Sequence, residues 1–344
     1  LGKGIAEVAD GIEKLVRRTN GANILASEIE LHHTPELFST FAIPYSYDPA
    51  ALCPIFMDYL YGVQPEGEGR DALQMLAGLS LVPDCRYEVV FILYGEGGTG
   101  KTVFLSILEH LVGRENFCCL PLNKFTEKHS IHLLTEKLLN VVGDLPTASE
   151  SVSLNQIEGT LKDVASGSNL PVERKNRDPL TAPAIARCIF ASNSLPAFAD
   201  RSNGIWDRLR IIPFNQRFRN TEKQNPNLKH DIVRNELPGV FNWAIEGLAK
   251  LRKLKRFPDT SEGLKLVQKH RNDCDHERQF LSDYEAHPGA YVIKPALYED
   301  YRAFCLRNGF RSKNSTNFYN EVNRLFPNIH EEQCRVIEGR FRIF

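Results

Sequence analysis

The residues with the clearest chemical meaning form one glycine-rich run, Gly95-Glu96-Gly97-Gly98-Thr99-Gly100-Lys101-Thr102. The run fits the pattern GxxxxGK[ST], with an apolar strand-like segment before it and a helix-like segment after it. Glycines let successive backbone N–H groups turn towards phosphate oxygens, and the N-terminus of the following helix adds partial positive charge. We therefore expect this loop to hold the phosphates of ATP, with Lys101 on the terminal phosphates and the Thr102 hydroxyl on Mg²⁺.

Two polar residues follow later apolar runs, at positions where strands of a parallel sheet would end. Asp144 follows KLLNVVG, and Asn193 follows ARCIFAS. A carboxylate at such a position can hold Mg²⁺, and a side-chain amide can contact the terminal phosphate or orient the attacking water. Only one acid stands at this point, between Gly143 and Leu145, so the general base stays open. Each residue could instead begin a turn.

Cationic side chains gather in two further segments. Leu170–Pro179 reads as a hairpin whose tip carries Arg174, Lys175 and Arg177, which suits contact with a phosphate backbone without sequence reading. An exposed polar turn is the alternative. The second segment, DRSNGIWDRLRIIPF, offers the residues Arg201, Arg208 and Arg210. One of these could stabilise the transition state on a neighbouring subunit's nucleotide, and the residues alone do not decide which.

The elements that must position these residues alternate along the chain. Short β-branched and aromatic runs predict strands at residues 88–94, 137–144, 186–193 and 208–214. Helical spacing follows the first strand at residues 101–112, and a second helical segment, 154–166, lies between two of the strands. Strands separated by helices indicate an α/β fold with a largely parallel central sheet and crossover helices.

The order of these motifs resembles that of the superfamily 3 helicases. GEGGTGKT, NVVGDLP, SGSNLPVERKNRDP and IFASNSLPAFADRSNGIWDRLRIIPF follow one another as in the branch of phage and plasmid primase-helicases and poxvirus replication ATPases. The resemblance implies a P-loop, AAA+-like ATPase and an ATP-dependent DNA helicase. It also implies a ring, expected to be a hexamer, that moves on single-stranded or forked duplex DNA, with a primase domain or protein as a further partner.

The resemblance also implies roles for individual residues. Its phosphate and Mg²⁺ ligands match Lys101 and Thr102, and its second acidic motif matches Asp144. The DNA-contacting hairpin of the family matches Lys175 and Arg177, which lie beside Arg174. Its polar sensor matches Asn193, and its arginine that acts on the adjacent subunit matches Arg208. Asp207 departs from the pattern, because the family often carries a basic residue there.

Four segments are expected along the chain. They are a helical N-terminal segment (1–86), the ATPase core (87–220), a polar helical connector (221–279) and a C-terminal module (280–344). In the last of these, helical patterns at 294–309 and 314–326 precede a β-ribbon, which resembles the winged-helix module of the same family. Because the chain starts at Leu1, we expect it to be a piece of a longer polypeptide.

Composition limits the class of protein. No apolar run is long enough to cross a bilayer, so we expect a cytoplasmic location, in the host cell if the gene belongs to a phage or plasmid. The net charge is −1, yet residues 1–100 hold 14 acidic and 6 basic side chains, whereas residues 162–219 hold 5 acidic and 10 basic ones. This excess predicts a local basic surface.

Other residue types argue against metal or disulfide chemistry. The eight cysteines show no CxxC pair and are interpreted as reduced packing residues. His129, His132 and the run Cys274-Asp275-His276 lack the further ligands of a zinc site, so we assign them to surface and packing. Two alternatives to a helicase stay open, an ATPase that acts as a loader and a DNA-binding replication initiator.

Overall fold

The computed structural model describes most of the chain beyond residue 40. The described residues are 41, 43–45, 47–127, 129–143, 154–174, 178–196, 198, 203–222, 224–285, 287, 290–336 and 339–343. At 154–155 and 333–343 only the backbone is described. The chain divides into two compact units, of which the first ends at Val267 and the second begins at Gln268. Each unit is described by itself.

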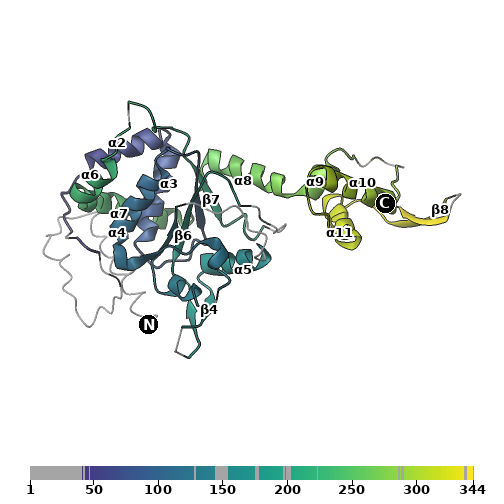
Figure 1. The fold of residues 1–344 in the computed structure, drawn as a ribbon, viewed down its shortest axis with the longest axis horizontal. Helices are drawn as coiled ribbons and strands as arrows, with labels where there is room; N and C mark the ends of the chain where they lie inside the picture. The colour runs from purple at the N-terminus through teal and green to yellow at the C-terminus, as the bar shows by residue number, and fades with distance from the viewer. Residues whose placement is uncertain are drawn as a thin grey trace. The chain divides into compact units, whose positions relative to one another are not determined.

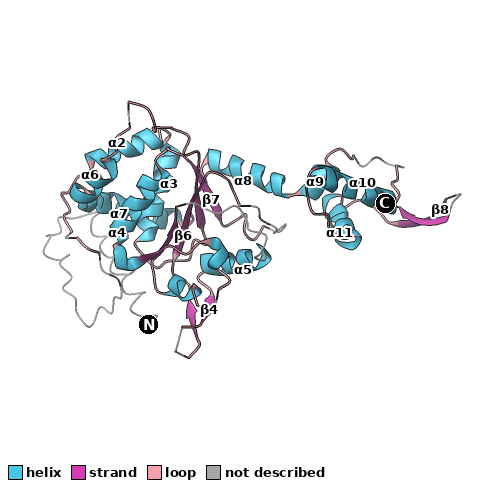
Figure 2. Ribbon diagram, in the orientation of Figure 1, coloured by secondary structure: helices cyan, strands magenta, loops and turns pink. Residues whose placement is uncertain are grey.

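A five-stranded parallel sheet forms the centre of the first unit (Figure 2). The spatial order of its strands is β2-β3-β6-β1-β7. Their bounds are Phe117–Cys118 (β2), Leu139–Val142 (β3), Arg187–Ser192 (β6), Val90–Tyr94 (β1) and Leu209–Pro213 (β7). The four predicted strands are therefore confirmed, each within a few residues of its expected ends. Since all strands are parallel, their carboxyl ends share one edge of the sheet.

Helices cover one face of this sheet (Figure 1). They are α2 (Pro54–Val63), α3 (Gly67–Ser80), α4 (Lys101–Val112), α6 (Leu228–Asn235) and α7 (Leu237–Leu254). Alternate residues of the strands, such as Phe91 and Leu93 on β1, are buried in the same apolar cluster as these helices. Burial of both sheet faces explains why the strands read as continuous apolar runs.

The opposite face of the sheet is covered by α5 (Leu154–Ala165) and by the segment after β2. That segment contains the 3₁₀ turns η3 (Leu122–Lys124) and η4 (Ile131–Thr135), whereas the turn η2 (Arg114–Asn116) directly precedes β2. Asn140, fully buried on β3, holds it by accepting from the Leu120 amide at 2.7 Å and donating to the Leu120 carbonyl at 3.0 Å. The segment is thereby fixed by a polar contact inside an apolar layer.

A separate antiparallel hairpin projects between α5 and β6. It pairs β4 (Asn169–Val172) with β5 (Leu180–Pro183). The hairpin that the sequence predicted at residues 170–179 is therefore confirmed as a pair of strands. Its tip includes residues 175–177, which lie outside the described residues.

The predicted polar connector is partly a core element. Instead of one polar helix, the region contains α6, α7 and α8 (Ser261–Cys274). Helix α7 buries Val240, Trp243, Leu248 and Leu251 against α3 and the rest of the apolar cluster. Its Lys and Arg residues stand in the last turns only, which explains why the charged end KLRKLKR suggested an exposed helix.

The second unit has its own small apolar core. Helices α9 (His276–Leu281), α10 (Lys294–Arg307) and α11 (Ser315–Leu325) enclose Phe280, Tyr301 and Phe318, and a ribbon of β8 (Glu332–Val336) and β9 (Gly339–Ile343) follows. The two predicted helices and the β-ribbon are confirmed. The Glu277 carboxylate, 1% exposed, accepts from the Tyr301 hydroxyl at 2.7 Å.

Two absences in the described part of the chain bear on the expected class of protein. None of its helices is both long and apolar enough to span a membrane. Its cysteines are free, and five of them, including Cys118 and Cys188, are buried, whereas Cys119 is exposed. Burial raises the pKa of both buried thiols to about 12, so they are poor nucleophiles. The predicted packing role is confirmed for the buried cysteines.

Candidate nucleotide-binding site

The glycine-rich run forms the loop between β1 and α4, as the sequence predicted. Gly98 and Gly100 have positive φ angles of 83° and 95°. Residues other than glycine rarely adopt such φ angles, so glycine at these positions permits the tight turn that leads into α4. A Cβ at Gly97 would meet no atom within 4 Å, which leaves the outer side of the loop open. The loop therefore has a tight turn at Gly98 and Gly100 and open space beside Gly97.

Lys101, the first residue of α4, points back under this loop. Its Nζ donates to the carbonyl oxygens of Gly95 at 2.5 Å and Glu96 at 2.7 Å, and its side chain is 7% exposed. The Thr99 hydroxyl also donates to the Glu96 carbonyl, at 3.0 Å. These contacts hold an ammonium group at the centre of the loop, where it can exchange a carbonyl oxygen for a phosphate oxygen. Thr102, the next residue, is exposed on the first turn of the helix.

The ends of neighbouring strands bring a second predicted residue to Lys101. Strand β6 lies beside β1, with Tyr94 opposite Ser192, so Gly95 and Asn193 follow at the same edge of the sheet. The Lys101 Nζ lies 3.2 Å from the Asn193 Oδ1 and donates to it. Asn193 is otherwise exposed. Its amide therefore faces the position that a terminal phosphate on Lys101 would occupy.

The third predicted strand end is described only in part. Strand β3 lies on the other side of β6, with Val142 opposite Phe190, and ends two residues before Asp144. Asp144 lies outside the described residues. Its predicted role as a ligand of Mg²⁺ stays a prediction.

Two contacts to the loop were not predicted from the sequence. The Tyr59 hydroxyl of α2 donates to the Gly100 carbonyl at 3.0 Å, and burial raises the pKa of this tyrosine. On the other side, the Phe218 amide donates to the Gly98 carbonyl at 2.9 Å. Both are tertiary contacts between distant parts of the chain, and neither has a local sequence signal. Together they fix the loop from two directions.

The hairpin residues predicted to contact DNA are described only at their start. Arg174 forms an ion pair with Glu136, at the base of the hairpin. Lys175 and Arg177 lie outside the described residues. The Arg174 guanidinium is therefore already paired within its own chain, and the cationic tip stays a prediction.

Arg208 lies at the amino-terminal ends of the parallel strands, whereas the glycine-rich loop follows the carboxyl-terminal end of β1. Arg208 directly precedes β7, whose first residue, Leu209, pairs with Val90 at the start of β1. The Arg208 guanidinium contacts the Glu88 carboxylate and donates to the Gly204 carbonyl at 2.7 Å and the Ser166 hydroxyl at 3.0 Å. At about 3.3 Å per strand residue, the five residues of β7 separate Arg208 from the loop level by roughly 16 Å. This is more than an arginine side chain can reach.

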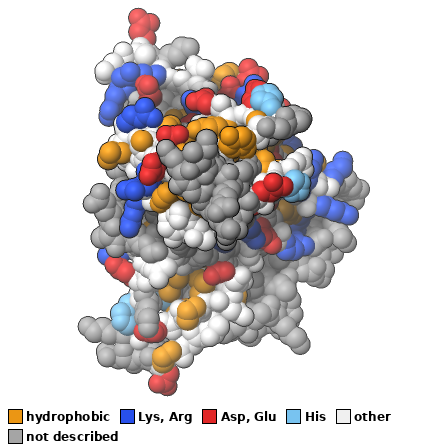
Figure 3. Space-filling model, turned by 90° about the vertical axis from the view of Figure 1, so that its right-hand side faces the viewer, with side chains coloured by type: hydrophobic (Ala, Val, Ile, Leu, Met, Phe, Trp, Pro, Cys, Tyr) orange, Lys and Arg blue, Asp and Glu red, His pale blue; other side chains and the backbone are white. Residues whose placement is uncertain are grey.

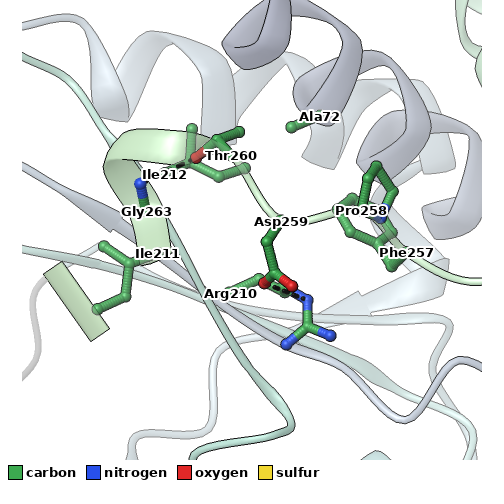
Figure 4. A pocket seen from close by; sticks show the side chains of 9 residues that line it. All are labelled: Ala72, Arg210, Ile211, Ile212, Phe257, Pro258, Asp259, Thr260 and Gly263. Atoms are coloured by element: carbon green, nitrogen blue, oxygen red, sulfur yellow. Dashed lines mark hydrogen bonds and ion pairs between the residues drawn. The ribbon is translucent and has the colours of Figure 1, made fainter. Parts of the chain in front are cut away.

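The two other candidate arginines differ from Arg208. Arg210 Nε lies 3.1 Å from an oxygen of Asp259, in a small pocket that Phe257 and Thr260 also line (Figure 4). Burial lowers the pKa of Arg210, and Asp259 offsets part of that effect. Arg210 thus ties β7 to the segment before α8. Arg201 lies outside the described residues.

The excess of basic residues at 162–219 does not form one exposed surface in the described part of the chain. Arg187 is 1% exposed and donates to the carbonyls of Asp84 and Val89, while Arg208 and Arg210 are in ion pairs. On the face drawn in Figure 3, described Lys and Arg side chains stand in separate groups among acidic ones. The expectation of a local basic surface is therefore wrong for these buried and paired residues.

Metal ligands do not cluster within the described residues. No group of three or more His, Cys, Asp or Glu side chains there could hold a metal ion. Among the residues assigned to packing, His276 stacks on Phe310 at 3.7 Å between ring centroids. Any Mg²⁺ in the glycine-loop site would depend on Thr102, Asp144 and the phosphates themselves.

Similar sequences come from large DNA viruses. Residues 93–208 match a family of unknown function, DUF5906. "Putative helicase L207/L206" of Acanthamoeba polyphaga mimivirus is 23% identical over 256 residues, which cover 66% of this chain and 25% of that protein. "Putative helicase 121R" of Invertebrate iridescent virus 3 is 26% identical over 144 residues, which cover 40% of this chain and 15% of that protein. The chain thus corresponds to a quarter or less of each viral relative.

Solved structures match a larger share of this chain than the viral sequences do. The apo C-terminal region of NrS-1 (residues 305–718 of that protein) superposes with a TM-score of 0.55 and 13% identity, over 88% of this chain and 77% of that chain. A further crystal form of the same region gives a TM-score of 0.54 and 14% identity, over 90% of this chain and 79% of that chain. The α/β fold with a central parallel sheet is shared. The viral relatives confirm the resemblance to helicases of phage and viral type.

Proposed function

We propose that this chain is the motor part of an ATP-dependent DNA helicase of the superfamily 3 type. The observation that carries the proposal is the contact between Lys101 and Asn193 at the carboxyl edge of the sheet. Two residues chosen independently, one from a phosphate-binding pattern and one from a strand end, meet at one point. The viral relatives named as helicases support the DNA-directed role.

ATP with Mg²⁺ is the proposed nucleotide. Bound Mg²⁺ would neutralise charge on the terminal phosphates and favour their transfer to water. The backbone N–H groups of the loop would orient the phosphates, and Lys101 would compensate their charge. Thr102 is exposed at the first turn of α4, where its hydroxyl can serve as a metal ligand, and Asp144 is the proposed acidic partner. Asn193 would position the water or the terminal phosphate.

We propose that copies of the chain form a ring, expected to be a hexamer, and the position of Arg208 supports this proposal. This residue cannot contact the loop of its own chain, because the two lie at opposite edges of one sheet. Its side chain is 24% exposed, and it is paired with the carboxylate of Glu88 in the same chain, which is 48% exposed. Such a guanidinium can act on the nucleotide of an adjacent copy. Arg208 is therefore the proposed trans-acting arginine.

Single-stranded or forked duplex DNA is the proposed track, gripped by the tip of the β4–β5 hairpin. Lys175 and Arg177 would contact phosphates, and a hairpin from each subunit would meet the strand inside the ring. The second unit is proposed to be a winged-helix module that assists DNA contact. A primase domain or protein is a proposed partner. The proposed location is the cytoplasm, that of the host cell if a phage or plasmid encodes the protein.

Two assays on the purified chain test the proposal. We expect Mg²⁺-dependent ATP hydrolysis that single-stranded DNA stimulates, and ATP-dependent separation of a forked duplex. Lys101→Ala is the control, and it should abolish both activities while leaving the circular dichroism spectrum unchanged. Hydrolysis without strand separation at any protein concentration would favour an initiator or loader. Near-normal turnover by Lys101→Ala would contradict the ATPase site itself.

A further inference from the structure

The segment that follows β7 lies directly against the glycine-rich loop. The amides of Phe218 and Arg219 both point to the Gly98 carbonyl, at 2.9 Å and 3.3 Å. A Cβ built at Gly98 would lie 2.4 Å from the Cβ of Arg219. The absence of a side chain at Gly98 is therefore what allows Arg219 to approach the loop.

The backbone of this segment is fixed on both sides of Arg219. The Phe218 ring packs against the apolar cluster, 3.5 Å from a Cβ built at Gly62 of α2. After Arg219, the Thr221 hydroxyl and amide both donate to the Phe218 carbonyl, at 2.7 Å and 3.1 Å, and Asn220 has a φ of 61°. The contact between Arg219 and the loop is thus the product of an ordered turn.

The charge of Arg219 has no counterpart within the described part of the chain. Its side chain is exposed and forms neither a hydrogen bond nor an ion pair with the residues described there. In the same unit, Arg208 is paired with Glu88 and Arg210 with Asp259. An arginine whose backbone and Cβ are fixed beside a loop that suits phosphates, without a carboxylate partner in the described part of the chain, is complementary to an anion held by that loop.

We propose that Arg219 is a second phosphate-binding side chain of this site, supplied by the same chain as the loop and directed at the phosphates beyond the α-phosphate. The inference rests on the proposed function. Lys101 would approach the polyphosphate from beneath the loop, whereas Arg219 would approach it from the side of Gly98. Because a guanidinium offers two parallel donors, it would also orient the polyphosphate.

Calorimetric titration of the chain with ATP, ADP and AMP in the presence of Mg²⁺ tests this role. We expect Arg219→Ala to weaken ATP and ADP binding by about tenfold or more, as for a lost charged hydrogen bond. Binding of AMP should change by less than about twofold. Arg219→Lys should recover part of the loss, because it keeps the charge but not the paired donors.

Arg217→Ala is the matched control, because Arg217 is also an exposed arginine without an ion pair among the described residues, and the atoms nearest to a Cβ built at Gly98 all belong to Arg219. It should bind ATP like the unmodified chain. Equal effects of the two alanine variants, or equal losses for AMP and ATP in Arg219→Ala, would overturn the assignment. If Lys101→Ala also leaves ATP binding unchanged, the nucleotide site is wrong. If only Lys101→Ala weakens it, the site stands and the role of Arg219 fails.

Discussion

The Lys101 Nζ and the Asn193 Oδ1 lie 3.2 Å apart, although 92 positions separate the two residues along the chain. The sheet order explains the contact, since β1 and β6 are neighbours and both residues follow the carboxyl ends of these strands. Each partner helps to fix the other. The amide oxygen accepts from the ammonium, so the NH₂ group of Asn193 is the part of its side chain that could donate to a phosphate or a water.

Substitution of Asn193 separates its positioning role from nucleotide affinity. Asn193→Ala should lower kcat by about 100-fold, comparable to the loss of one donor to a developing negative charge, while ATP affinity changes little. Asn193→Asp should instead weaken ATP binding, because a carboxylate of the same size would pair with Lys101 and repel phosphates. Steady-state hydrolysis together with ATP titration distinguishes the two effects. A normal kcat in Asn193→Ala would contradict the proposed role.

The sequence predicted this part of the site because its signals are local. The loop pattern fixes Lys101, and apolar runs followed by a polar residue mark strand ends such as that before Asn193. The contacts of Tyr59 and Phe218 with the loop could not be predicted, since they arise from packing of α2 and of the chain after β7. Net charge by segment misled for Arg187, because a buried guanidinium counts in the composition but not on the surface.

The polar interpretation of residues 221–279 had a different cause. Lys and Arg at the end of α7 outweighed the apolar residues before them, although Val240, Ala244, Leu248 and Leu251 recur at helical spacing. That period was visible in the sequence and indicates one buried face. Which surface would cover it depended on the tertiary position of α3, which no local pattern contains.

The hairpin tip is expected to carry much of the electrostatic contact with DNA. Replacing Lys175 and Arg177 together by alanine should weaken binding to single-stranded DNA. The slope of log affinity against log salt should flatten by roughly 0.7 for each lost phosphate contact. Hydrolysis without DNA should persist, because neither residue belongs to the glycine-rich loop or to its predicted Mg²⁺ ligands. Fluorescence anisotropy at several salt concentrations measures the slope.

A matched pair of substitutions controls for net charge. Lys253→Ala with Arg256→Ala removes the same charges from an exposed site near the end of α7. This variant should keep the salt slope of the unmodified chain. If both double variants give the same slope, the DNA path does not include the hairpin.

Helix α2, which supplies Tyr59 to the loop, depends on Glu236 for its N-terminus. The carboxylate of this residue, 5% exposed, accepts from the Ile55 amide at 3.0 Å and the Phe56 amide at 2.8 Å. Glu236→Gln leaves one of these two N–H groups without an acceptor and removes the charge at the helix start. We expect the free energy of unfolding to fall by about 1–3 kcal/mol.

Urea unfolding followed by tryptophan fluorescence measures this decrease in the free energy of unfolding. Trp243 packs against Phe56, with ring centroids 4.8 Å apart, so its emission reports on the start of α2. Glu222→Gln removes an exposed carboxylate that does not lie at the start of a helix, and it serves as the control. Identical unfolding midpoints for the two variants would show that the Glu236 carboxylate does not stabilise α2.

Arg208 should act on the nucleotide of the adjacent subunit, because its own loop lies at the other edge of the sheet. Lys101→Ala and Arg208→Ala subunits should each be inactive alone. Mixed in one ring, they create interfaces where an intact loop meets an intact arginine, and some hydrolysis should return. Two variants of a self-contained site could not restore activity in this way.

The measurement is the ATP hydrolysis rate against mixing ratio, after conditions that let subunits exchange, with native mass spectrometry to show that mixed rings form. The rate should be highest at intermediate ratios, because only unlike neighbours build an intact site.

Glu88→Gln adds a separate check on the contact that Arg208 makes within its own chain, since it weakens this ion pair without removing the guanidinium. Glu88→Gln subunits should hydrolyse ATP on their own, with no second variant mixed in. If mixed rings form and the rate stays at background at every ratio, Arg208 does not act in trans, and Arg210 or Arg201 should be tested in the same way.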